Sequence, residues 1–471
     1  MVELNTVIFD VLYLLAAILF IMGIKKMGHP RTAVTGNLLG VVGMLLAAGV
    51  SFLITLENES IQNSLTLPIG TIVGAIFIGT LFGTVLATRV QMTEMPQLVA
   101  VFNGVGGLAS VLVAAASLMA TKDSSIPVEV VVAGGVSGLI GAVTFVGSGV
   151  AAGKLQELNF FKKQLPIPTL IRHVLNLAML IGCGWCVFEM IDTGNVLLYL
   201  VICVLGCALG YTLTTPIGGA DMPVVIALLN SYSGLAAAAT GFVVDQPVLI
   251  ISGSLVGASG VILTSLMCKA MNRSLLSVLF GGGMTSSYEQ DEGIYATVKR
   301  TTAEDVAMMV DFADRVVFVP GYGMAVAQAQ NAVSDLAAMI EQRGATVEYA
   351  IHPVAGRMPG HMNVLLAEAD VSYEQLRTLE EINPDFDEVD IAIVLGANDV
   401  VNPEARKEGT PVSGMPILNV DEARQVVVIK RSLSPGYAKI ANPLFAADNT
   451  SMLFGDGKAA IQDISAALKE L

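Results

Sequence analysis

The chain has 471 residues, of which 54% are hydrophobic and only 14% are charged, and its mean hydropathy is +0.69. Soluble globular domains carry about a quarter charged residues, so this composition indicates an integral membrane protein. Residues 1–285 hold 11 Lys/Arg against 12 Asp/Glu, whereas residues 286–471 hold 14 against 28 and carry a net charge of −14. A strongly acidic surface argues against a nucleic-acid partner, which would require a basic one.

Nine apolar segments are each long enough, at about 20 residues, to cross the hydrocarbon core of a bilayer as a helix. They lie at residues 5–24, 34–54, 67–87, 97–120, 127–150, 171–191, 195–214, 222–242 and 247–268. When the intervening links are assigned alternately to the two sides of the membrane, one side receives ten Lys/Arg residues and the other receives only Lys122. Because basic links face the cytoplasm, we expect the N-terminus outside and the C-terminal part in the cytoplasm.

The composition changes abruptly after these spans. We expect a membrane domain at 1–275, a polar, Gly/Ser-rich linker at 276–305 and a soluble domain at 306–471. The soluble part opens with a β-branched run, a glycine turn, an amphipathic helix and a second strand pattern, all within 315–351. The turn, Gly321-x-Gly323-x-x-Val326, fits the dinucleotide-binding fingerprint. Its glycines let the backbone approach a pyrophosphate, and the following helix N-terminus supplies partial positive charge.

Further β-branched runs at 389–395 and 425–430 extend this pattern into an open, doubly wound parallel sheet of the Rossmann type. Each run is followed by a polar loop, at 396–403 and 430–437, which is where ligand sites lie in such sheets. We therefore predict a helical multi-span bundle followed by a soluble α/β domain that binds a nucleotide.

The residues after the second strand favour NADP over NAD. An NAD site would place a carboxylate there for the ribose 2′-hydroxyl, but residues 352–357 contain none. Lys430, Arg431 and Ser432 instead offer two cations and a hydroxyl for a 2′-phosphate. The alternative is that these three residues form only a solvated basic corner.

Several long motifs resemble one family. "GYGMAVAQAQ" (321–330), "HPVAGRMPGHMNVLLAEA" (352–369), "GANDVVNP" (396–403) and "KRSLSPGY" (430–437) resemble the NADP(H)-binding domain of the proton-translocating, Re/Si-specific NAD(P)+ transhydrogenases. "QMTEMPQLVAVFNGVGG" (91–107) and "GGADMPVVIALLNSYSG" (218–234) resemble two of their membrane helices. The likeness covers essentially the whole chain and corresponds to the bacterial beta subunit.

This resemblance implies a function and a set of partners. Hydride transfer from NADH to NADP+, which is reversible, would be coupled to inward proton movement across the bacterial inner membrane. NADP(H) would bind this chain, and NAD(H) would bind a partner alpha subunit. The resemblance also implies contact between two beta subunits in an α2β2 dimer, and it implies no metal site.

The resemblance further implies which residues surround NADP(H). Those along the pyrophosphate would be Gly321, Tyr322, Gly323, Ala325 and Val326. A loop closing over the nucleotide would contain Arg357, Met358, Pro359 and Gly360. Additional cofactor contacts would come from Val354, Ala355, Gly356, Gly396 and Ala397. Asn398 and Asp399 would lie near the nicotinamide, Lys430, Arg431 and Ser432 would bind the 2′-phosphate, and the cover would include Gly436, Tyr437, Gly455 and Asp456. Because hydride transfer is the chemistry of the cofactors themselves, we expect Asp399 to position the nicotinamide.

Polar residues inside the spans mark a candidate proton route. Asn230 lies nine residues beyond Asp221, or about 13 Å at the helical rise, and Asn103 lies about 10 Å beyond Pro96. Unpaired polar groups are costly in hydrocarbon and usually face the bundle interior or water. We expect the two asparagines to organise water, with Asp221 at the inner mouth. The alternatives are that the amides only bond helices together and that Asp221 only caps its helix.

One departure from the family pattern bears on this route. Many members of the family carry histidine at the position of Asn103, and an asparagine amide cannot hold a proton near neutral pH. We therefore do not expect a single titrating residue at position 103 to carry the proton.

Two other functions are compatible with a membrane bundle joined to a nucleotide domain. A channel or transporter gated by a nucleotide-sensing domain would bind nucleotide without redox exchange. A self-sufficient membrane reductase would need a flavin, a haem or a second nucleotide site, and no matching motif is present in the sequence.

Overall fold

The computed structural model describes residues 2–28, 30–57, 66–120, 126–156, 158–162, 167–280, 292–358, 360–410, 412–436 and 438–471. The chain forms two compact units. One consists of Met1–Pro216 and Val225–Leu263, and the other of Ile217–Val224 and Thr264–Leu471.

Nine helices among the described residues are long and apolar enough to cross a membrane. Their bounds are α1 Val2–Met27, α2 Pro30–Glu57, α4 Thr66–Arg89, α5 Met95–Ala120, α6 Val128–Leu155, α8 Thr169–Thr193, α9 Leu197–Thr214, α10 Met222–Val243 and α11 Pro247–Ala270. Each helix coincides with one predicted span, so the predicted multi-span bundle is confirmed. The short helices η1 (Met92–Glu94), α7 (Asn159–Lys162) and η2 (Gly219–Asp221) lie in the links between spans.

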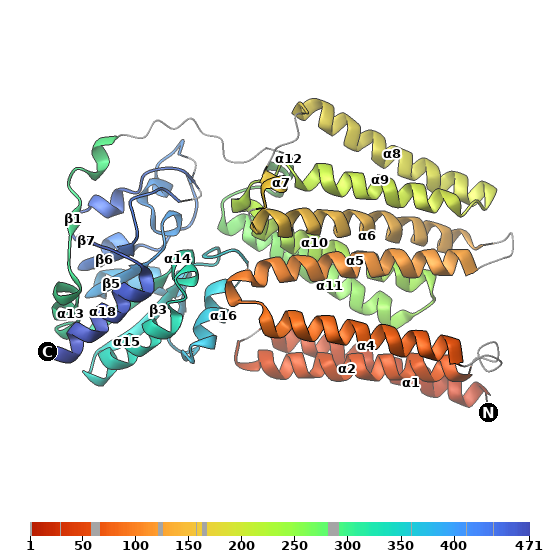
Figure 1. Ribbon diagram of the computed structural model, residues 1–471, viewed down its shortest axis with the longest axis horizontal. Coiled ribbons are helices and arrows are strands. Elements are labelled where there is room, and N and C mark those ends of the chain that lie inside the picture. Colours follow the sequence, from red (N-terminus) through yellow and green to blue (C-terminus); the bar gives the residue numbers. More distant parts are fainter. Residues whose placement is uncertain are drawn as a thin grey trace. The chain divides into compact units, whose positions relative to one another are not determined.

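Small residues allow the membrane helices to pack closely. Helices α5 and α6 run side by side (Figure 1), and a Cβ built on Gly107 would lie only 2.6 Å from the carbonyl oxygen of Gly141. Similarly, a Cβ on Gly234 of α10 would lie 2.5 Å from the backbone nitrogen of Gly257 in α11. Close backbone approach of this kind is how helices associate in lipid, where burial of apolar surface gives no driving force.

A seven-stranded, entirely parallel sheet organises the soluble part of the second unit, with the strand order β1-β7-β6-β5-β2-β3-β4. The strands are β1 Lys299–Arg300, β2 Arg315–Pro320, β3 Thr346–Ile351, β4 Leu376–Thr378, β5 Ile391–Leu395, β6 Gln425–Lys430 and β7 Thr450–Phe454. The winding direction reverses between β2 and β5, which gives a topological switch point of the kind at which α/β folds bind ligands.

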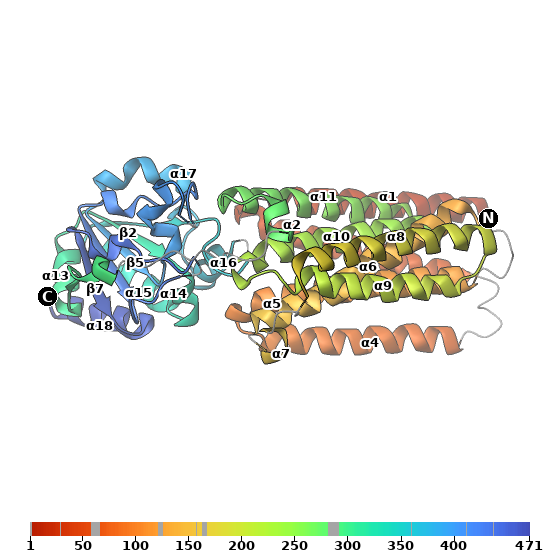
Figure 2. The ribbon, with the colours of Figure 1, turned by 90° about the horizontal axis from the view of Figure 1, so that it is seen from above.

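Helices cover both faces of this sheet. They are α13 Ala303–Asp311, α14 Tyr322–Val326, α15 Gln330–Gln342, α16 His361–Glu368, α17 Leu379–Ile382 and α18 Gly457–Glu470. The unit also contains α12 (Leu275–Phe280) and several short 3-10 helices. These are η3 Glu292–Tyr295, η4 Asn383–Glu388, η5 Asp399–Val401, η6 Pro403–Arg406, η7 Val420–Glu422 and η8 Pro443–Ala446. α13 and α18 pack together on one side of the sheet, and α17 lies on the other (Figure 2). This doubly wound arrangement confirms the predicted Rossmann-like fold.

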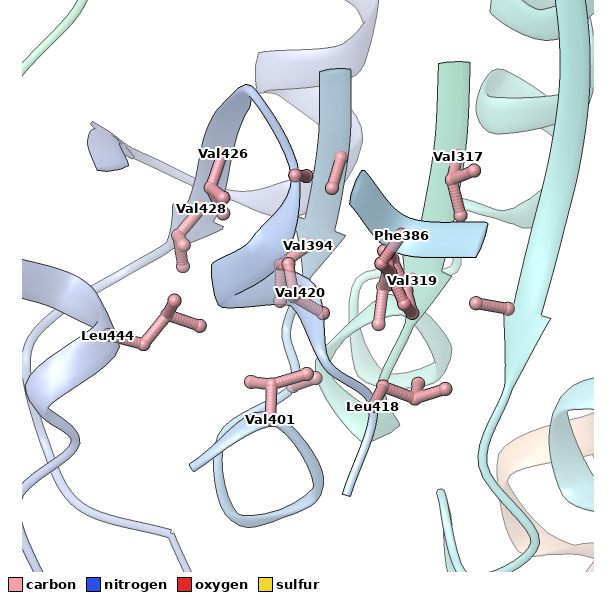
Figure 3. Close-up of a cluster of buried hydrophobic side chains, with 14 of the residues drawn as sticks. Val317, Val319, Phe386, Val394, Val401, Leu418, Val420, Val426, Val428 and Leu444 are labelled. Carbon is pink, nitrogen blue, oxygen red and sulfur yellow. The ribbon is translucent and has the colours of Figure 1, made fainter. Parts of the chain in front are cut away.

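The core beneath α17 is built from valines of the central strands. Val317, Val394 and Val428 from β2, β5 and β6 belong to one buried cluster with Phe386 and Leu418 (Figure 3). Parallel strands covered on both faces favour β-branched apolar residues, which explains why these strands were recognisable in the sequence. The rigid sheet fixes the loops that leave its carboxyl edge.

Candidate functional site

A pocket of about 400 Å³ lies at the carboxyl ends of β2, β5 and β6, within the second unit. The predicted cofactor-binding residues that line it are Gly321, Tyr322, Gly323, Val354, Ala355, Gly356, Arg357, Gly396, Ala397, Asn398, Asp399, Lys430 and Gly436. Those that do not line it are Ala325, Val326, Met358, Gly360, Arg431, Ser432, Gly455 and Asp456. Pro359 and Tyr437 lie outside the described residues. Drug- and cofactor-sized ligands bind in pockets of about 300–1,000 Å³, so the volume suits part of a dinucleotide.

The fingerprint glycines bring two loops of the switch point together. A Cβ on Gly321 would lie 2.4 Å from the Cα of Ala397, and one on Gly323 would lie 2.6 Å from the Cα of Gly396. The N–H groups of Gly321 and Gly323 donate to the carbonyl oxygens of Leu395 and Gly396, each at 2.9 Å. Side chains at these two positions would push the loops after β2 and β5 apart.

The helix predicted after this turn is divided into two. α14 has five residues, and the chain then turns through Gln328, whose φ is 49°, before α15 begins at Gln330. Because α14 has only five residues, few aligned peptides contribute to the partial positive charge predicted at its N-terminus.

Arg357 and Tyr322 form one wall of the pocket. The Arg357 guanidinium lies 4.5 Å from the centre of the Tyr322 ring, a cation–π distance, and both residues line the pocket. The loop that carries Arg357 turns at Gly356, whose φ of 111° suits glycine. Behind this loop, the backbone N–H of Arg357 donates to Nδ1 of His361 at 3.0 Å.

Asp399 holds the segment that follows β6. Its Oδ2 accepts a hydrogen bond from the backbone N–H of Ala438 at 3.0 Å. The backbone of Gly436 approaches so closely that a Cβ there would lie 2.5 Å from Asp399 Oδ1. Asp399 thus links the end of β5 to the segment that contains Gly436 and Ala438 (the cover segment), and both of these residues line the pocket.

The three residues predicted to bind a 2′-phosphate differ in their exposure and contacts. The Lys430 ammonium lies 5.0 Å from the centre of the Phe445 ring and donates to the carbonyl oxygen of Ser434. Burial lowers the pKa of Lys430, and the nearby Asp399 opposes that shift. Arg431 is exposed, and the Ser432 hydroxyl lies 2.8 Å from that of Ser434. Only Lys430 of the three lines the pocket.

Two buried histidines, His352 and His361, support the loop after β3, and neither was predicted from the sequence as a site residue. His352 Nδ1 accepts from the N–H of Val354 at 3.2 Å, and its Nε2 lies 2.8 Å from the carbonyl oxygen of Pro416. Burial lowers the pKa of His352 to about 4, so the ring is neutral at physiological pH. Both histidines stand inside the motif at 352–369, but their contacts depend on the folded loop.

The family described as NAD(P) transhydrogenase beta subunit matches residues 9–467 of the chain. The chain belongs to the NAD(P) transhydrogenase beta subunit family. Two curated proteins named NAD(P) transhydrogenase subunit beta, one from Rhodospirillum rubrum and one from a named strain of that species, are each 45% identical over 471 residues. The match covers 97% of this chain and 98% of each relative.

Membership in this family, together with the nine candidate membrane helices, identifies a membrane protein that uses nicotinamide nucleotides. The resemblance inferred from the motifs is thereby confirmed. The pocket at the switch point is the candidate nucleotide site of this transhydrogenase subunit.

The polar membrane residues of this transhydrogenase subunit differ in their contacts. Asn103 of α5 is buried, and its Nδ2 donates to the carbonyl oxygen of Ile226 in α10 at 3.3 Å. The Ser231 hydroxyl donates to the carbonyl oxygen of Gly257 at 2.7 Å. Asn230 is half-buried, and its side chain makes no hydrogen bond with the residues that the structure describes. Asn103 and Ser231 therefore bond helices together, whereas Asn230 keeps its amide available.

Asp221 forms a buried ion pair at the start of α10. Its side chain has 3% exposure, and both carboxylate oxygens accept from Arg273 Nη1 at 3.0 Å. Burial raises the pKa of Asp221, and Arg273 opposes that shift. Arg273 also lines the pocket, and both residues belong to the second unit.

Proposed function

We propose that this chain is the NADP(H)-binding and proton-translocating beta subunit of a bacterial transhydrogenase. It couples hydride transfer from NADH to NADP+, in either direction, to inward proton movement across the inner membrane. A partner alpha subunit binds NAD(H), and two copies of each subunit form the enzyme. The N-terminus lies outside, and the NADP(H)-binding domain lies in the cytoplasm.

The observation that carries the nucleotide assignment is the charge around the pocket. Arg357 and Lys430 line it together with Arg273, which pairs with Asp221, and exposed Arg431 adjoins Lys430, so the pocket is rich in the basic side chains that bind phosphates. The carboxylate of β3, Glu348, lies towards the start of the strand and pairs with Arg315 at 2.7 Å. The end of β3 therefore offers cations nearby but no carboxylate for a ribose 2′-hydroxyl, which favours NADP(H).

When bound, NADP(H) would supply the hydride chemistry, and the chain would supply binding, orientation and exclusion of water. Arg357 and Lys430 would hold phosphate oxygens. Asp399 would fix the cover segment over the nicotinamide half through Ala438. Apolar side chains in the lining, including Val400 and Met415, would keep water from the reacting carbon.

Arg273 supports coupling between nucleotide and proton. It lines the pocket and also binds both carboxylate oxygens of Asp221. NADP+ and NADPH differ in the charge of the nicotinamide ring, so the two forms act differently on a guanidinium in the same pocket. Coupling requires such a difference, because nucleotide binding and proton movement then bias one another. Asn230, with its available amide, would order water further along α10.

Reconstitution with the NAD-binding alpha subunit tests this function. Proteoliposomes containing both subunits should form NADPH from NADH and NADP+, and an imposed inward proton gradient should accelerate the reaction. Nucleotide binding without NADPH formation would favour a gated channel or transporter. NADPH formation by this chain without the alpha subunit would favour a self-sufficient reductase. A rate indifferent to the gradient would refute coupling.

A further inference from the structure

His361 lies directly beneath the loop that forms one wall of the pocket. It begins α16 and has only 1% exposure. Its Nδ1 accepts a hydrogen bond from the backbone N–H of Arg357 at 3.0 Å. A Cβ built on Gly356 would lie 2.6 Å from both Cβ and Nδ1 of His361, so the loop backbone rests on this side chain.

The two ring nitrogens of His361 have different surroundings. A nitrogen that accepts a hydrogen bond carries no proton, so the neutral ring has its proton on Nε2. Burial, with the charge of Arg357, lowers the pKa of His361 to about 4, which keeps the ring neutral at physiological pH. Nε2 is buried and has no hydrogen-bond partner among the described residues. The contact that this ring supplies to the loop is therefore the acceptor at Nδ1.

The loop held by His361 carries a pocket residue. The Arg357 guanidinium stacks on Tyr322 at 4.5 Å, and both residues line the pocket. The His361 ring also packs near Tyr322, with the ring centres 6.1 Å apart and the planes tilted by 56°. The His361 ring thus accepts a hydrogen bond from the backbone of Arg357 and packs near the ring of Tyr322, so it adjoins both members of the stacked pair.

We propose that His361 is a positioning residue for NADP(H) binding: its Nδ1 fixes the loop at 354–358 so that Arg357 remains stacked on Tyr322 in the pocket wall. This inference rests on the proposed function for the identity of the ligand. It assigns His361 no contact with the nucleotide and no role in proton transfer.

Three substitutions separate the acceptor from the bulk of the ring. Asn places its amide oxygen where histidine has Nδ1, Gln places it one carbon further along, and Leu has no acceptor. In membranes that also contain the alpha subunit, His361→Asn should keep the KM for NADP+ within about twofold of the unchanged chain. His361→Gln and His361→Leu should raise it about tenfold, because the Arg357 N–H loses its acceptor. The rate at saturating NADP+ and the KM for NADH should stay within about twofold for all three.

Hydrogen exchange of the nucleotide-free chain provides a readout that a general loss of stability would not reproduce. The Arg357 amide should exchange faster in His361→Gln and His361→Leu but not in His361→Asn. Amides of β5 should remain as protected as in the unchanged chain, which verifies folding. If His361→Asn is as impaired as His361→Leu, or if His361→Leu leaves Arg357 exchange unchanged, the inference is wrong. Failure of the unchanged chain to bind NADP+ would instead overturn the proposed function.

Discussion

Replacing Gly436 with alanine tests the contact between the cover segment and Asp399. A Cβ at this position would lie 2.5 Å from Asp399 Oδ1 and 2.6 Å from Oδ2, which is closer than real Cβ contacts allow. The backbone of Gly436 is not in the left-handed region, so the cost comes from this contact alone. Either the carboxylate leaves its hydrogen bond to Ala438, or the segment moves outward.

The magnitude follows from the cost of inserting a methyl group where no space exists. Overpacking costs about 1–3 kcal/mol. We expect nucleotide binding to require this segment in contact with Asp399, and we expect the ligand-free chain to relieve the added methyl group by moving the segment. The cost then falls on the bound state, and the Kd for NADP+ rises about 5- to 140-fold, at 1.4 kcal/mol per factor of ten.

Calorimetric titration of the full-length chain with NADP+ measures this change. Gly455→Ala is the matched control: although the family resemblance implies that Gly455 belongs to the cover, this residue does not line the pocket, and the atom nearest to its built Cβ is the Cβ of Ala460 at 3.9 Å. The control should bind NADP+ within about twofold of the unchanged chain. Unaltered affinity in Gly436→Ala, or an equal loss in Gly455→Ala, would refute the assigned role of the Asp399 contact.

Three further predictions concern charge and the membrane route. Burial raises the pKa of Glu348, but hydrogen bonds and charge from Arg315 and Arg377 outweigh it and lower the pKa below 4.5. The resulting stability is present above pH 4.5 and is lost as pH falls through the folded-state value. Glu348→Gln should therefore lower the unfolding free energy, measured by thermal unfolding, by about 1–3 kcal/mol at pH 7 and by less at pH 3. An equal loss of unfolding free energy at the two pH values would contradict this. Arg431→Ala should weaken NADP+ binding about 10- to 100-fold in competition titrations, and an equal effect on NAD+ would argue against a 2′-phosphate contact. Asn230→Leu should abolish proton uptake into vesicles, measured with a pH-sensitive dye, while the Kd for NADP+ stays within about twofold; normal uptake would exclude Asn230 from the route.

The nine membrane spans were predictable because hydropathy is a local property. A run of about 20 apolar residues is helical in lipid whatever its neighbours, since every backbone group must be satisfied within the segment. The same applies to β2, β5 and β6, whose β-branched runs suit a sheet covered on both faces. Short strands escaped this reasoning: β1 has two residues and β4 has three, too few to show any periodicity.

The sequence by itself determined which loops leave the carboxyl edge of the sheet, and so which segments contribute to the candidate pocket. Only the tertiary structure decided how those loops meet. Gly321 faces Ala397, Asp399 bonds Ala438, and His361 bonds Arg357, each through contacts set by loop conformation. Local preferences fix a helix or a strand, whereas the partner of a side chain depends on where folding places residues that are distant in the chain.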